Sequence, residues 1–131
     1  MQNKENIELA AIDEKIAALN FHVTTQRTPD QVAQLIADAA EVSGSAGPKT
    51  TLTRVAAHQF NGVMKNFARV QMAEFTVTLQ PASDGRTAVQ LSIGDYLRTR
   101  DTLFYFIPIT PWGAPGYKAL ASFSDYLRNK L

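Results

Sequence analysis

The chain has 131 residues, 45% of them hydrophobic, and a formal net charge of +1, so it is long enough for one domain with its own core. It has no cysteine, which excludes disulfides, thiolate catalysis and sulfur-ligated metals, and its near-neutral charge argues against nucleic-acid partners. No apolar run reaches the ~20 residues of a membrane helix, and residues 1–6 show no signal-peptide pattern. We therefore expect a cytoplasmic protein without a membrane span.

Residues 1–19 differ in pattern from the rest of the chain. Apolar side chains recur there every three or four residues, as on one face of a helix: Leu9, Ile12, Ile16 and Leu19. This stripe covers about two heptads, which is too short for a stable isolated coiled coil. We expect a helical lead-in that lies on the domain formed by residues 20–131, and the alternative is an interface for homo-oligomers.

The clearest local signal is the start of a helix. A strand is expected at 20–25, where apolar and polar residues alternate. Thr28 then supplies an N-cap, a proline occupies the first helical position, and Gln31 completes a capping box. We predict a helix over 29–42, which ends at the glycine-rich segment 43–48.

From Lys49 onward the apolar period changes to two, which is typical of half-buried strands. Asn61-Gly62 and Asp84-Gly85 have the composition of type I′ turns and predict two hairpins. The strand-like run 63–80 is too long for one strand. We therefore expect a bulge or turn within 66–71.

The last third of the chain predicts a hairpin-like pair of strands followed by a closing helix. The strands are expected at 87–93 and 103–109, with a turn over 96–101 between them. A proline- and glycine-rich breaker at 108–116 leads into an amphipathic helix that starts at Tyr117 and runs to the end.

This element order predicts an α+β domain with a curved antiparallel sheet, helices on one face and a C-terminal amphipathic helix. The order, the capped helix at 28–42 and the stretch 106–111 before Gly116-Tyr117-Lys118 resemble the START-like, polyketide-cyclase-like (SRPBCC) superfamily of helix-grip proteins. The resemblance covers residues 20–131. It implies an apolar cavity between sheet and helix and binding of lipids, sterols or polyketides, and some members are cyclases or hydrolases. Our expected C-terminal helix is shorter than theirs, so a small or filled cavity is the alternative.

Catalytic chemistry is not indicated. The chain contains no nucleophile motif, phosphate-binding loop or metal-ligand spacing, so we predict no catalytic residue, cofactor or metal site. His22 and His58 are the only histidines and lack partners in suitable spacing. Asp95 continues the apolar phase of its strand but is expected to be a turn residue in solvent, and the basic residues at 98 and 100 are expected at a solvated sheet edge.

The expected site is therefore an apolar one, bounded by the sheet, the C-terminal helix and the aromatic-rich junction that precedes it. Its predicted ligand-binding residues are Phe75, Val77, Val89, Leu91, Phe104, Phe106, Trp112, Tyr117, Leu120, Phe123 and Leu127. The leading hypothesis is non-catalytic binding of a small hydrophobic ligand, lipid-like or polyketide-like. The alternatives are a protein-interaction module with a packed core and no ligand, and a cyclase- or hydrolase-type enzyme.

Overall fold

The computed structural model describes residues 4–100, 102–103, 107–108, 110 and 112–131. The elements follow in the order α1 (Lys4–Ala17), β1 (Phe21–Thr25), α2 (Pro29–Ser43), a 3₁₀ turn (Gly44–Ala46), β2 (Lys49–Ala56), β3 (Gln59–Lys65), β4 (Gln71–Pro81), β5 (Thr87–Tyr96), β6 (Thr102–Leu103), β7 (Ile107–Pro108) and α3 (Tyr117–Lys130). The α+β class predicted from the sequence is confirmed.

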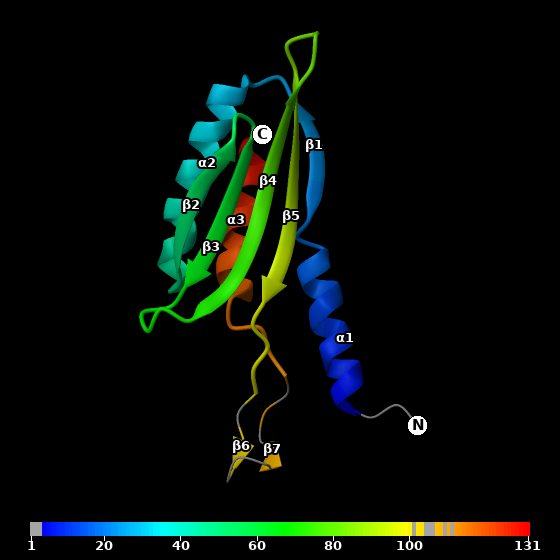
Figure 1. Ribbon diagram of the computed structural model, residues 1–131. Coiled ribbons are helices and arrows are strands. Elements are labelled where there is room, and N and C mark those ends of the chain that lie inside the picture. Colours follow the sequence, from blue (N-terminus) through cyan, green and yellow to red (C-terminus); the bar gives the residue numbers. More distant parts are fainter. Residues whose placement is uncertain (1–3, 101, 104–106, 109, 111) are drawn as a thin grey trace.

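The main sheet of the described residues is open and antiparallel, with strand order β1-β5-β4-β3-β2. Its first strand crosses over to pair with β5, in a register that places Phe21 opposite Leu91 and Thr25 opposite Thr87. Helices α2 and α3 lie together against one face of this sheet (Figure 1). This arrangement is compatible with a helix-grip-like fold.

Helix α2 begins where the sequence predicted and runs one residue further, to Ser43. The Thr28 hydroxyl accepts a hydrogen bond from the Gln31 amide at 3.2 Å, and the Gln31 side chain accepts one from the Thr28 amide at 2.9 Å. These two bonds satisfy donors that the helix itself leaves unpaired. Because every contact of this cap is local in sequence, the pattern alone was sufficient to find it.

The core fills the layer between the sheet and the two helices. Its members include buried apolar side chains from both sides of this layer: Val32, Ile36 and Ala39 of α2, Phe60 and Met64 of β3, Ala73, Phe75, Val77 and Leu79 of β4, Val89 and Leu91 of β5, and Ala119, Leu120, Phe123 and Leu127 of α3. The period of two along β4 and the first half of β5 confirms the half-buried alternation expected there from the sequence.

The predicted hairpin at Asn61-Gly62 is wrong. Both residues lie inside β3. The chain reverses at residues 57–58, between Ala56 and Gln59, which pair with each other. Gly62 is required for a different reason: a Cβ atom at this position would lie 2.1 Å from Cζ of Phe75 on the neighbouring strand. Glycine within a strand often marks such a close approach.

Two of the other expected reversals, within 66–71 and at Asp84-Gly85, are confirmed. The break within 66–71 is a turn that joins β3 to β4, in which the Arg69 amide donates to the Asn66 carbonyl at 2.9 Å. At the β4–β5 turn, Gly85 has a φ of +86°, a backbone conformation that residues other than glycine rarely adopt.

The predicted strand over 103–109 does not pair with 87–93. Both edges of β5 are already occupied, by β4 and β1. The described residues of this segment form the two short strands β6 and β7, which pair with each other beyond the end of the sheet (Figure 1).

Candidate functional site

Most of the predicted site residues meet at the interface between the sheet and α3. Seven of them are at most 2% exposed: Phe75, Val77, Val89, Leu91, Leu120, Phe123 and Leu127. The rings of Phe75 and Phe123 lie with centroids 4.3 Å apart at an interplanar angle of 40°. These seven side chains belong to one contiguous core cluster, and their predicted role in ligand binding stays a prediction. Phe104 and Phe106 lie outside the described residues.

The remaining two predicted residues, Trp112 and Tyr117, line a pocket at the N-terminal end of α3. Its volume is about 290 Å³, close to the lower limit of ~300 Å³ for small-molecule sites. One wall comes from α1 and the other from the segment that enters α3. The lining residues are Ile12, Lys15, Ile16, Trp112, Gly113, Ala114, Tyr117 and Lys118.

Helix α1 supplies this wall because its apolar stripe faces the domain. Ile12, Lys15 and Ile16 are three and four residues apart, so they lie on one face of the helix. Ile16 is 3% exposed, and just beyond the helix the carbonyl of Leu19 accepts a hydrogen bond from the buried Ser124 hydroxyl at 2.7 Å. The C-terminal end of α1 is therefore anchored to α3.

The pocket lining is cationic. It contains two lysines and no acidic residue. The Lys15 ammonium lies over the Tyr117 ring, 4.0 Å from its centroid, which is a cation–π arrangement. In the part of the chain that the structure describes, Lys118 has no hydrogen-bond or ion-pair partner. An anionic group that entered the pocket would find two positive charges at its walls.

Trp112 closes one side of this site. Its ring lies under the Arg100 guanidinium, 4.6 Å away, and its amide donates to Glu8 Oε2 at 3.3 Å. The indole Nε1 is buried and has no hydrogen-bond partner among the described residues. Such an unsatisfied donor typically costs about 1–3 kcal/mol.

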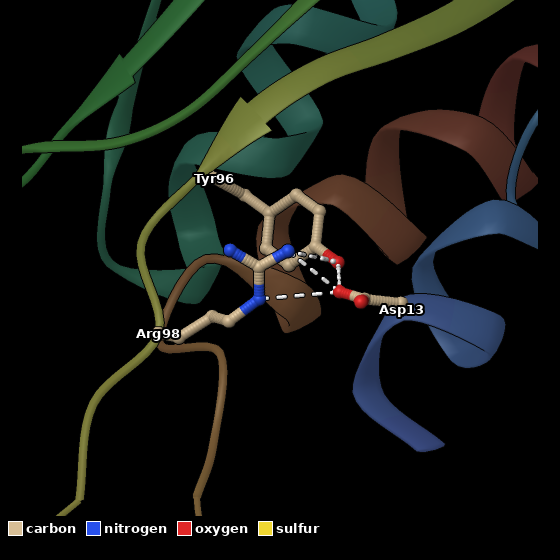
Figure 2. A network of polar contacts seen from close by, with 3 residues as sticks. All are labelled: Asp13, Tyr96 and Arg98. Atoms are coloured by element: carbon tan, nitrogen blue, oxygen red, sulfur yellow. Dashed lines mark hydrogen bonds and ion pairs between the residues drawn. The ribbon is translucent and has the colours of Figure 1, made fainter. Parts of the chain in front are cut away.

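A second anchor holds the middle of α1 against the end of β5 (Figure 2). The Asp13 carboxylate accepts hydrogen bonds from the Tyr96 hydroxyl and from the Arg98 guanidinium, with Oδ1 at 3.1 Å from Nε and 2.6 Å from Nη2. Arg98 also lies over the Tyr96 ring, 4.4 Å from its centroid. We refer to Asp13, Tyr96 and Arg98 as the α1 latch.

The three side chains of the α1 latch have shifted pKa values. The hydrogen bond from Tyr96, followed by that from Arg98, lowers the pKa of Asp13 below its ordinary value. Burial and the hydrogen bond to Asp13 raise the pKa of the Tyr96 phenol, and the Asp13 hydrogen bond raises the pKa of Arg98. This is the pattern of a structural ion pair at an exposed surface.

The residues considered for catalysis do not form a site. His22, His58 and Asp95 are all exposed, as expected from the sequence. Asp95 lies within β5, however, and not in a turn, and its amide donates to Glu74 Oε1 at 3.4 Å. No group of three or more potential metal ligands occurs in the described part of the chain. None of the helices described combines the length and apolarity that a membrane crossing requires.

Sequence reasoning missed six of the eight residues that line the pocket: Ile12, Lys15, Ile16, Gly113, Ala114 and Lys118. The stripe on α1 showed which face would be buried, but the surface that receives this face is set by contacts such as Asp13 to Tyr96, 83 residues apart. The aromatic cluster at the entry to α3 was the signal that found Trp112 and Tyr117.

Comparisons of this chain with protein-family models, with curated proteins and with solved structures found no match.

Proposed function

We propose that this protein binds a small amphipathic ligand, without transforming it, in the pocket between α1 and the start of α3. The observation that carries the proposal is the pocket of about 290 Å³ whose apolar walls also present two lysines and no acidic residue. Apolar walls with a few convergent polar groups are typical of ligand sites. The two lysines favour a ligand with an acidic end.

The packing of the core favours the pocket at the N-terminal end of α3, and not the interface between the sheet and α3, as the binding site. Phe123 and Leu127 are fully buried, and Leu120 is 2% exposed, so the chain's own side chains occupy that layer. The strand order is compatible with the helix-grip fold of START-like proteins. Because members of that superfamily bind hydrophobic ligands, the resemblance adds an expectation of such a ligand here. Membership of that superfamily is part of the proposal.

A pocket-filling variant tests the proposal. Ala114 lines the pocket, whereas Ala37 lies exposed on α2; Ala114→Phe therefore fills the site and Ala37→Phe is its matched control. Native mass spectrometry of protein purified from cells should show a small-molecule adduct on the wild type and on Ala37→Phe, and none on Ala114→Phe. The proposal is wrong if no adduct appears and no member of a panel of fatty acids, sterols and polyketides alters the melting temperature.

A second candidate function, a protein-interaction module built on α1, is favoured by one observation. Ile7 on this helix is 57% exposed, although a large aliphatic side chain gains from burial. Light scattering of the purified chain separates the two candidates. A dimer that Ile7→Ser converts to a monomer would favour the interaction module, and a monomer at all concentrations would favour the ligand-binding function.

A further inference from the structure

The turn between β3 and β4 presents an aromatic side chain to solvent. Phe67 is 100% exposed, and Val70, three residues on, is 46% exposed. The turn projects from the lower end of the sheet, away from the β4–β5 turn at the upper end (Figure 1). A single exposed hydrophobic residue is ordinary on a protein surface, but here two large apolar side chains, Phe67 and Val70, are exposed together in one turn.

The exposure of Phe67 is built into an ordered turn. Asn66 Oδ1 accepts hydrogen bonds from the amides of Ala68 at 2.9 Å and Val70 at 3.0 Å. The Asn66 amide donates in turn to the Val70 carbonyl at 3.0 Å. Arg69 has φ of +64°, in the left-handed region that non-glycine residues seldom adopt. These bonds fix the backbone on both sides of Phe67, so its position outside the core is part of the fold.

Positive charge surrounds this tip without an internal counter-charge. Lys49 on β2 lies directly opposite Lys65 on β3, and like charges at such positions repel each other. Arg69 adds a third cation within the turn. Between Glu41 and Glu74 the chain has four basic residues, including Arg54, and no acidic one. None of the three cations at the tip has an ion-pair partner among the described residues.

The nearest acidic side chain on β4 does not neutralise these cations. Glu74 lies opposite Val63. Its carboxylate accepts hydrogen bonds from the Gln71 side chain at 3.5 Å and from the Asp95 amide at 3.4 Å. The tip therefore combines an unpartnered aromatic ring with three unpaired positive charges.

We propose that the β3–β4 tip, defined as Lys49, Lys65, Phe67, Arg69 and Val70, docks on an anionic lipid surface. The tip is convex and carries one large apolar side chain, whereas a specific protein interface buries about 800 Å² on each partner. A phenylalanine that enters the boundary between headgroups and acyl chains needs no such area, and neighbouring cations gain from anionic headgroups. The net charge of +1 is too small to attract the whole molecule to anionic headgroups. The three cations of the β3–β4 tip therefore orient this tip toward the membrane.

Co-sedimentation of the full chain with vesicles tests this inference. The vesicles are phosphatidylcholine alone, or phosphatidylcholine with about one third phosphatidylserine, which sets a surface potential typical of anionic membranes. We expect binding to the anionic vesicles only, weakened by added salt. Phe67→Ser should lower the partition coefficient about ten-fold, and the double change Lys49→Gln with Lys65→Gln should lower it about five-fold per cation removed.

Two matched controls separate the tip from general surface properties. Val55→Ser removes another exposed apolar side chain, 49% exposed on β2, and Arg86→Gln removes a cation from the β4–β5 turn at the opposite end. Both should bind like the wild type. The proposal is overturned if the wild type does not prefer anionic vesicles, or if Phe67→Ser binds them as well as the wild type. The first result would leave an acidic protein as the partner of the tip.

Discussion

Gly62 on β3 and Phe75 on β4 lie opposite each other, and the Phe75 ring covers the glycine. A Cβ atom at position 62 would lie 2.1 Å from Cζ of Phe75. The ring cannot easily move aside, because its other side packs on Phe123 with centroids 4.3 Å apart. This contact joins the middle of the sheet to α3.

Gly62→Ala should therefore destabilise the fold. Because the added methyl group meets a buried ring in a packed layer, we expect the free energy of unfolding to fall by about 1–3 kcal/mol. Urea denaturation followed by circular dichroism measures this change. Gly44→Ala is the control, since a Cβ there meets no atom within 4 Å. A loss no larger for Gly62→Ala than for Gly44→Ala would show that the ring is free to shift.

This pair also explains why one turn prediction failed. Asn61-Gly62 has the local composition of a hairpin turn, but its glycine serves a contact with Phe75, which no local pattern reveals. The hairpin at Asp84-Gly85 was correctly predicted, because its determinants are adjacent in sequence and Gly85 has a positive φ. Asp84 does not have one, so the turn is not of the predicted type I′. Sequence patterns therefore predicted the turn whose determinants are adjacent in sequence, and failed where the glycine serves a contact with another strand.

The core between the sheet and α3 gives a second prediction. Phe123 is fully buried and contacts Phe75, so Phe123→Ala should lower the free energy of unfolding by about 3–5 kcal/mol. Asp125→Ala, on the exposed side of the same helix, should change it by less than about 0.5 kcal/mol. A loss near 1 kcal/mol for Phe123→Ala in thermal or urea denaturation would contradict a tightly packed layer.

The α1 latch predicts a pH-dependent attachment of the first helix. The pKa of Asp13 is lowered in the fold, so its contribution is fully present above its unfolded pKa and is lost as the pH falls through the lower folded value. The pKa of Tyr96 is raised, so its contribution is present below its unfolded pKa and is lost as the pH rises through the folded value. The attachment should thus be strongest between these two limits.

Asp13→Asn tests the latch near neutral pH. Exposed ion pairs contribute only about 0.2–1 kcal/mol, so the amides of α1 should exchange with deuterium about two- to five-fold faster than in the wild type. Glu14→Gln is the control, because in the described structure this neighbouring exposed side chain makes no hydrogen bond or ion pair. Equal exchange in Asp13→Asn and the wild type at neutral pH would rule out the latch as an anchor of α1.

Only two of the eight residues that line the candidate site were predicted, for a related reason. Trp112 and Tyr117 were found because aromatic residues cluster before α3 in the sequence. Lys15 was not found, because its place in the pocket depends on how α1 docks, and docking is decided by pairs such as Asp13 and Arg98, 85 residues apart. Contacts of that separation leave no periodic trace in the sequence.

The most direct test of the ligand-binding account uses Trp112, the single tryptophan of the chain, which lines the pocket. Its fluorescence is recorded during titration with decanoic acid and, separately, with decanol. The account predicts a saturable change in emission, at lower concentration for the acid because of Lys15 and Lys118, and no change in Ala114→Phe. An emission spectrum unaffected by either compound, or a response that is the same in the filled variant, would contradict it.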